Sequence, residues 1–247
     1  MLHTVTKIVR TVAATIPDRR GTTAPDTLDA LHREFTELDD ALCAALRGRL
    51  DPLTPAGGCW VVDALDGAVQ YLQGLPQWCV SVALLVDEVP TLTVLHSPHL
   101  GETYTAVAGG GAHRDGAPIR PSTKTDPAAA LAATSHPHVR QPDANRLAGL
   151  ALPRVLDTVA AVRNLGPTSW QVADVAAGRV DLFWQYGRDS ENLLGASLVA
   201  AEAGAVVSTA AGAPWTPGAA DFLVAAPGLH AAAVRVLTVG ADLLLFG

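Results

Sequence analysis

The chain has 247 residues, of which 49% are hydrophobic and 17% are charged, so it can form one large domain or two fused small ones. Its net charge of −7 argues against a nucleic-acid partner and against docking on anionic membranes. No apolar run predicts a membrane span, and residues 1–20 lack a signal-peptide pattern. We therefore expect a cytoplasmic protein whose three cysteines are buried thiols without disulfides.

The first part of the chain predicts two helices followed by an antiparallel meander. Residues 4–16 and 26–50 have the apolar spacing of amphipathic helices, and Asp26 or Thr27 can cap the second. A loop rich in Pro and Gly follows, and then apolar segments alternate with turns. Strands are expected within residues 59–65, 79–98 and 102–119. We assign residues 1–120 to an N-terminal α+β part.

The second part alternates strand and helix patterns, which predicts layered α/β packing. Strands are expected within residues 129–137, 180–186, 205–212 and 221–227. Helices are expected within residues 144–152, 168–179, 191–204 and 228–240. We assign residues 121–247 to a C-terminal α/β part that packs tightly against the first part as one unit.

The segment WVVDALDG, residues 60–67, holds the strongest chemical signal in the chain. Asp63 and Asp66 close an apolar run directly before Gly67. A strand that ends in such a turn can direct both carboxylates and the Leu65 carbonyl at one point, which suits Mg²⁺. The N–H groups that follow Gly67 suit a phosphate. The same spacing also arises where an Asp only caps a helix, so the motif needs support from the rest of the chain.

Several blocks in a fixed order supply that support. The blocks VVDALDG, VAAGRVDLFW and AAEAGAVV are the strongest, and together with their surroundings they resemble the inositol monophosphatase family over roughly residues 58–230. The resemblance implies a layered αβαβα sandwich, Mg²⁺-dependent hydrolysis of small phosphomonoesters, and a homodimer. It carries Asp63, Leu65 and Asp66 over as metal ligands, and Gly67 as the glycine that faces phosphate.

The first half of the family signature is incomplete here. The threonine that orients the attacking water falls on Ala68, which has no hydroxyl. The pair of Glu residues expected before the first strand is absent from the shortened loop. Glu37, Asp39 and Asp40 lie upstream, and we interpret them as the polar face of a helix.

The second half of the signature is also altered. The Trp-Asp pair of the family falls on Glu191 and Asn192, so an amide replaces a carboxylate. Gln185 stands where the family often has a Glu that holds substrate hydroxyls, and Trp170 replaces a small pocket residue. We expect Glu191 and Asn192 to join Asp63 and Asp66 as catalytic residues. The expected substrate-binding residues are Gly67, Ala68, Gln185 and Trp170.

Without metals, Asp63 and Asp66 are a carboxylate pair that retains one proton, because two like charges resist ionisation at close range. We predict first a repurposed small-molecule enzyme, such as one of specialised metabolism, that needs no cofactor and performs acid–base cyclisation, elimination or isomerisation. One alternative is a Mg²⁺-dependent phosphomonoesterase with a reduced cluster, which needs Asp189 or Glu191 as a further ligand. The other is a non-catalytic member that binds a ligand or a partner.

Overall fold

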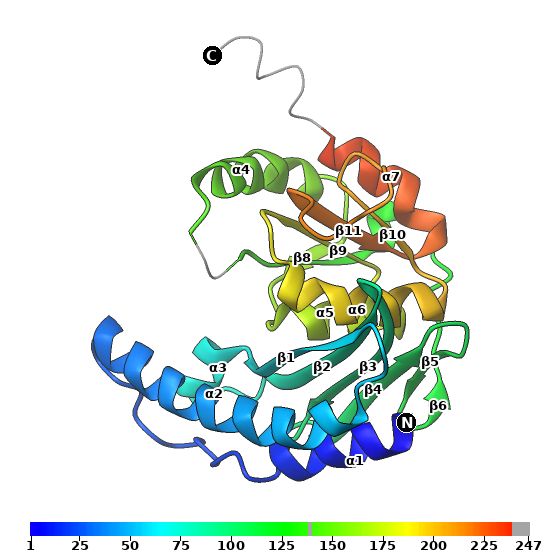
Figure 1. Ribbon diagram of the computed structural model, residues 1–247. Helices are drawn as coiled ribbons and strands as arrows, with labels where there is room; N and C mark the ends of the chain where they lie inside the picture. Colours follow the sequence, from blue (N-terminus) through cyan, green and yellow to red (C-terminus); the bar gives the residue numbers. More distant parts are fainter. Residues whose placement is uncertain (138–139, 239–247) are drawn as a thin grey trace.

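The computed structural model describes residues 1–137 and 140–238, which form five layers in the order helices, sheet, helices, sheet, helices (Figure 1). This confirms the α/β fold class and the layered αβαβα sandwich. The layers form because each amphipathic helix and each sheet must bury an apolar face against another element. Within the described ranges, no helix combines the length and the apolar character needed to cross a bilayer.

Two helices form the first layer. Helix α1 spans Leu2–Ala13 and helix α2 spans Leu28–Leu50, and both bury an apolar stripe against the first sheet (Figure 1). The side chain of Thr27 accepts a hydrogen bond from the Ala30 N–H at 3.3 Å, which confirms Thr27 as the cap of α2. A short 3₁₀ helix, Asp51–Leu53, leads from α2 into the sheet.

The first sheet is the predicted meander, with every strand antiparallel to the next in chain order. Its strands are β1 (Gly58–Asp66), β2 (Cys79–Val86), β3 (Val89–Ser97), β4 (Glu102–Val107), β5 (Gly111–Arg114) and β6 (Ala117–Pro118). The one-turn helix α3, Ala68–Leu72, lies between β1 and β2. Cys59 on β1 is exposed, Cys43 is half-buried and Cys79 is buried, so the prediction of buried thiols holds only for Cys79; all three are free.

The second sheet has the strand order β10-β11-β9-β7-β8. Its strands are β7 (Leu131–Thr134), β8 (Ala161–Arg163), β9 (Leu182–Tyr186), β10 (Val206–Ser208) and β11 (Asp221–Ala225). Strand β7 is parallel to both neighbours, because helices connect it to them. The sequence did not predict β8, which has only three residues, and the predicted strand 205–212 shortens to β10.

Helices α5 (Thr168–Ala176) and α6 (Ser190–Ala203) lie between the two sheets, while α4 (Pro142–Leu156) and α7 (Pro227–Leu237) cover the outer face of the second sheet (Figure 1). Every residue of α5 is buried. The predicted last helix ends at Leu237, and its expected final residues 239–240 lie outside the described residues. The two sheets lie on either side of residue 120, and the division into parts of 1–120 and 121–247 stays a prediction.

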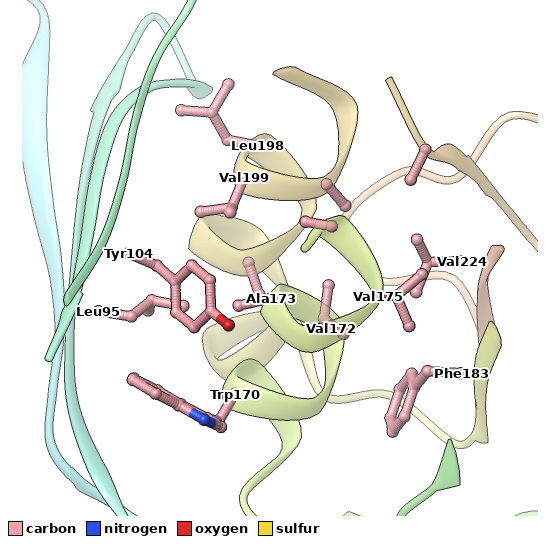
Figure 2. Packing of buried hydrophobic residues seen from close by; sticks show 14 of the residues in the cluster. Leu95, Tyr104, Trp170, Val172, Ala173, Val175, Phe183, Leu198, Val199 and Val224 are labelled. Carbon is pink, nitrogen blue, oxygen red and sulfur yellow. The ribbon is translucent and has the colours of Figure 1, made fainter. Parts of the chain in front are cut away.

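Figure 2 shows the central hydrophobic core, which α5 and α6 share with both sheets. The labelled side chains come from the first sheet (Leu95, Tyr104), from α5 (Trp170, Val172, Ala173, Val175), from α6 (Leu198, Val199) and from the second sheet (Phe183, Val224). One core therefore crosses three of the five layers.

Candidate active site

A β-bulge in β1 brings Asp63 and Asp66 to one face of the first sheet. Asp63 pairs with Ser81 and Asp66 pairs with Cys79, so β1 has one residue more than β2 over this interval. Without the extra residue, two positions three apart on a strand would point to opposite faces. Because Ser81 and Cys79 share a face, the bulge directs both carboxylates to that side.

Asp66 is held by the first turn of α5. Its Oδ2 accepts hydrogen bonds from the Ser169 N–H at 3.1 Å and from the Ser169 hydroxyl. The Cys79 thiol lies 3.4 Å from the same hydroxyl and 4.0 Å from Asp66 Oδ2. Asp66 is only 6% exposed, so this network fixes one orientation of its carboxylate. Ser169 is a site residue that the sequence analysis missed, because a Ser inside an apolar helix gave no distinct signal.

The chain turns sharply at Gly67. Its φ of +91° lies in the left-handed region, and a Cβ there would lie 2.9 Å from the Gln77 carbonyl oxygen. Only glycine fits, and Ala68 then begins α3. On the other side of Asp66, the Leu65 N–H donates to Asp63 Oδ1 at 3.1 Å and holds that carboxylate beside the backbone.

A third carboxylate, Asp189, joins the site at the start of α6. The Gln185 amide donates to Asp189 Oδ2 at 2.8 Å, and the Asn192 amide donates to Oδ1 at 2.9 Å. Gln185 is 1% exposed on β9, and it also accepts a hydrogen bond from the Thr168 hydroxyl at 3.3 Å. The two amides that replace carboxylates of the family pattern are therefore the groups that orient Asp189.

Burial and neighbouring negative charges raise the pKa of both Asp63 and Asp66. Burial and the nearby charge of Asp66 hold the pKa of Asp63 well above its ordinary value, and the charges of Asp39 and Asp189 add to this effect. Burial raises the pKa of Asp66 to about 6, although hydrogen bonds from Ser169 oppose the rise. The pair therefore retains a proton to a higher pH than two isolated carboxyl groups would.

Asp39 on α2 also belongs to this electrostatic environment. Burial raises the pKa of Asp39, and its Oδ2 lies 3.7 Å from the Cys43 thiol, which donates to it. The pKa of Cys43 is raised to about 11 by burial first and then by the charge of Asp39, with a further contribution from Asp63. Asp39 is therefore a half-buried member of the predicted polar face of α2, and its charge acts on Asp63.

The arrangement of the carboxylates bears on the metal cluster that the resemblance implies. Within residues 1–137 and 140–238, no three His, Cys, Asp or Glu side chains are arranged to hold one metal ion. Hydrogen bonds from Ser169 engage one oxygen of Asp66, and the two amides engage both oxygens of Asp189. Of the predicted ligand set, Asp63, Leu65 and Asp66 stand together on β1, and Asp189 is the carboxylate that approaches from α6.

Two predicted site residues lie elsewhere. Glu191 is exposed on the first turn of α6, whereas the charge of Asp189, at the start of the same helix, acts on Asp63. Trp170 is 5% exposed, and its ring packs edge-on against Tyr104 with centroids 4.9 Å apart (Figure 2). Trp170 is thus a core residue and not a pocket wall, because the buried α5 turns this position toward the first sheet.

Comparison with known sequences places these residues in a wider context. The sequence model of the inositol monophosphatase family matches residues 4–238. The protein named inositol monophosphatase of Dictyostelium discoideum is 33% identical over 149 residues, which are 60% of this chain and 55% of that protein. The Nus factor SuhB of Escherichia coli is 32% identical over 149 residues, with the same coverage of 60% and 55%. The chain thus spans about half the length of the curated relatives it matches.

Solved structures match over nearly the whole chain. The inositol monophosphatase of Anabaena (Nostoc) aligns with a TM-score of 0.82 and 25% identity, over 99% of this chain and 98% of that one. The SuhB structure of Mycobacterium tuberculosis aligns with a TM-score of 0.81 and 25% identity, over 96% and 95%.

Proposed function

Because the chain belongs to the inositol monophosphatase family, we propose that it is an enzyme that acts on a small molecule at Asp63, Asp66 and Asp189. One observation carries this proposal: three carboxylates from β1 and α6 share a site, and two amides orient the third. A shared buried charge of this kind costs folding stability, which a purely structural role would not explain.

The chemistry that the geometry supports best is proton transfer without a resident metal. Asp63 is the more exposed carboxylate of the pair, and burial and the charge of Asp66 raise its pKa, so in this proposal it is the group that exchanges a proton with a substrate. Asp66 is buried and fixed by Ser169, and its negative charge keeps the pKa of Asp63 high. Cyclisation, elimination and isomerisation are reactions that such a pair serves. Gly67 and Ala68 remain the proposed contacts to the substrate.

A second candidate is Mg²⁺-dependent hydrolysis of a phosphomonoester. The name of the Dictyostelium relative, inositol monophosphatase, favours it, and so does the position of Asp189, since the reduced cluster needs one carboxylate beyond β1. Asp63, the Leu65 carbonyl, Asp66 and Asp189 would hold the ion, which would supply positive charge to the phosphate. In this candidate Asp189 must leave the hydrogen bonds that it now accepts from Gln185 and Asn192.

A calorimetric titration with Mg²⁺ and Mn²⁺, with and without inorganic phosphate, separates the two candidates. Proton-transfer chemistry predicts no binding in the millimolar range and no release of phosphate from inositol 1-phosphate above the level of the Asp63→Asn variant. Infrared spectroscopy at neutral pH should show a protonated carboxyl band that disappears in Asp63→Asn. This band is the positive signature of the retained proton.

The Glu191→Gln variant is the matched control, because it removes an exposed carboxylate two residues from Asp189. Metal binding that is lost in Asp63→Asn and kept in Glu191→Gln, together with phosphate release, would replace the first candidate by the second. If the infrared band is missing and no metal binds, neither form of chemistry at Asp63 stands.

A further inference from the structure

A buried histidine, His96, lies on the first sheet beneath α1. It is 9% exposed, and it stands two residues after Val94, which packs in the outer core with the apolar side of α1. Side chains two apart on a strand share a face, whereas the intervening Leu95 packs with α6 in the central core. The imidazole therefore lies on the α1 side of β3, and the proposed chemistry at the carboxylate site does not use it.

The imidazole and a guanidinium from α1 share one hydroxyl group. His96 Nδ1 lies 3.0 Å from Thr103 Oγ1 and 3.0 Å from the Glu102 carbonyl oxygen. Arg10 donates to the same Thr103 oxygen through Nε at 2.9 Å and through Nη2 at 2.7 Å. Thr103 is buried, so the point where both groups meet is closed to water. Arg10 thus connects α1 to β4 directly beside His96.

The charges that act on the imidazole are already engaged with each other. They are the guanidinium of Arg10 and the carboxylate of Asp115, which lies in the turn after β5. Asp115 Oδ1 is 3.4 Å from Arg10 Nη2 and also accepts the Thr103 N–H at 2.9 Å. Strand β2 supplies only Val80 as the partner of His96 in register.

The remaining titratable groups around β3 and α1 are turned away or engaged elsewhere. The Glu102 carboxylate on β4 pairs with Arg179 at 2.6 Å. Lys7 and His3 stand on the exposed side of α1. His99 lies beside the C-terminal end of α1, so it is a second histidine whose protonation has to be separated from that of the buried imidazole.

A proton on His96 would place two cations on a single neutral oxygen. Burial lowers the pKa of His96 from its ordinary value of 6.5; the Glu102 carbonyl opposes this effect, and the charge of Arg10 adds to it. In an open state the hydrated imidazole binds the proton more readily than in the closed state. Stability that depends on the neutral imidazole is therefore complete above pH 6.5 and is lost as pH falls below it.

We propose that His96 is an acid-sensitive switch for α1: protonation of its imidazole expels the Arg10 guanidinium from Thr103 and favours the opening of α1. The segment after α1 links this opening to the candidate active site. Its Pro17 carbonyl accepts a hydrogen bond from the Tyr71 hydroxyl at 3.0 Å, and Tyr71 belongs to α3, which follows Gly67. An effect on catalysis rests on the proposed function, whereas the switch itself does not.

Hydrogen exchange of the α1 amides, corrected for the intrinsic exchange rate, measures the opening between about pH 7.5 and 5.5. The opening equilibrium constant of the wild type should rise by up to about tenfold over this range. His96→Gln should abolish the rise, because an amide takes up no proton. The matched controls His3→Gln and His99→Gln should keep it. A wild type without the rise, or a rise that is lost in His99→Gln and kept in His96→Gln, would overturn the switch.

Arg10→Met tests the same switch without a change at the buried position, since about half of the Arg10 side chain is exposed. Loss of the guanidinium should raise the midpoint of His96 protonation, followed by NMR of the ¹⁵N-labelled imidazole, and should reduce the rise in opening. An unchanged midpoint would overturn the proposal even if His96→Gln does not fold. Neither measurement uses activity, so failure of the chemistry at Asp63 would leave both results interpretable.

Discussion

Asp66 is a buried carboxylate whose orientation is fixed by hydrogen bonds. Ser169 donates to it twice from α5, and the bulge of β1 directs it away from solvent. Hydrogen bonds to a carboxylate lower its pKa, yet burial raises the pKa of Asp66 to about 6 in spite of them. The balance between these effects is a property of the folded state, so it appears in the pH dependence of stability.

The Asp66→Asn variant should change how stability depends on pH, measured by urea unfolding in the presence of a chelator. The folded pKa of about 6 exceeds the ordinary value of 3.8, so the folded state binds more protons between these limits. The wild-type free energy of unfolding should therefore fall as pH rises from about 4 to above 6, by up to about 3 kcal/mol relative to the variant. Parallel curves for the two proteins would contradict the raised pKa.

A substitution at Asn192 distinguishes metal-free proton transfer from Mg²⁺-dependent hydrolysis. The Asn192→Asp variant replaces a donor to Asp189 by a like charge, which should destabilise the metal-free protein by about 1–3 kcal/mol. Mg²⁺ should then raise the melting temperature of this variant and leave that of the wild type unchanged. Asn192→Ala is the control that removes the hydrogen bond without adding charge. A wild type that Mg²⁺ stabilises as much as Asn192→Asp would contradict the expectation.

At the scale of elements, the connection from β1 through Gly67 into α3 determines the shape of the site. The bulge sets the face of both carboxylates, and the left-handed backbone at Gly67 then turns the chain. Helices α5 and α6 reach the same place from the second half of the chain, and each presents one side chain of its first turn or cap. The site is thus assembled from the ends of elements that meet between the two sheets, and its side chains Asp66, Ser169 and Asp189 are buried there.

The Gly67→Ala variant should lose about 2–4 kcal/mol of stability in chemical denaturation. It adds a Cβ 2.9 Å from the Gln77 carbonyl oxygen and 3.1 Å from the Trp78 Cα, besides the strain of φ +91°. Gly204→Ala is a matched control, because Gly204 has φ +93° and no atom within 4 Å of the added Cβ. That variant should lose only about 1 kcal/mol. Equal losses of stability in the two variants would show that the close backbone contact at Gly67 does not contribute to the cost of the substitution.

At the scale of the whole molecule, the two halves share one hydrophobic core. Helix α6 packs against strands of the first sheet and against β10 of the second, and the central cluster includes Tyr104 from one sheet and Phe183 from the other (Figure 2). Neither sheet can lose α6 and keep its inner face buried. The parts 1–120 and 121–247 should therefore unfold together.

Calorimetric unfolding should give a single transition with equal van't Hoff and calorimetric enthalpies. Hydrogen exchange should lose its protection in β3 and β9 with the same free energy of opening. Val199→Ala should lower the free energy of opening by about 1–3 kcal/mol in β3 and in β9 alike, because Val199 is fully buried in the shared core. Separate transitions for the two sheets would contradict the shared core.

Oligomeric state belongs to the same scale, and the homodimer remains a prediction from family resemblance. Light scattering after size exclusion should give twice the chain mass of 25.5 kDa. A mass equal to one chain across a range of protein concentrations would contradict it.

From the sequence alone came the family resemblance, most of the helices and strands, and the pair Asp63 and Asp66 before Gly67. The helices and strands rest on local patterns, namely the helical period and alternating apolar residues, whereas the five layers were implied by the resemblance, which rests on motifs in a fixed order. Such patterns depend on neighbouring residues in the sequence, so they can be recognised without knowledge of the tertiary contacts. The same reasoning identified Gln185 and Asn192 as amides at positions where the family pattern has carboxylates, because their spacing from the blocks that resemble the family can be counted along the sequence.

Only the tertiary structure decided which side chains surround the pair. It brings Asp189 to the site in place of Glu191, adds Ser169, leaves Asp39 half-buried and turns Trp170 into the core. Spacing cannot give these results, because a shift of one residue on a strand, or a small rotation of a helix, exchanges the buried and exposed faces. The bulge in β1 and the packing of α5 and α6 between two sheets fix those rotations, and both depend on contacts between distant parts of the chain.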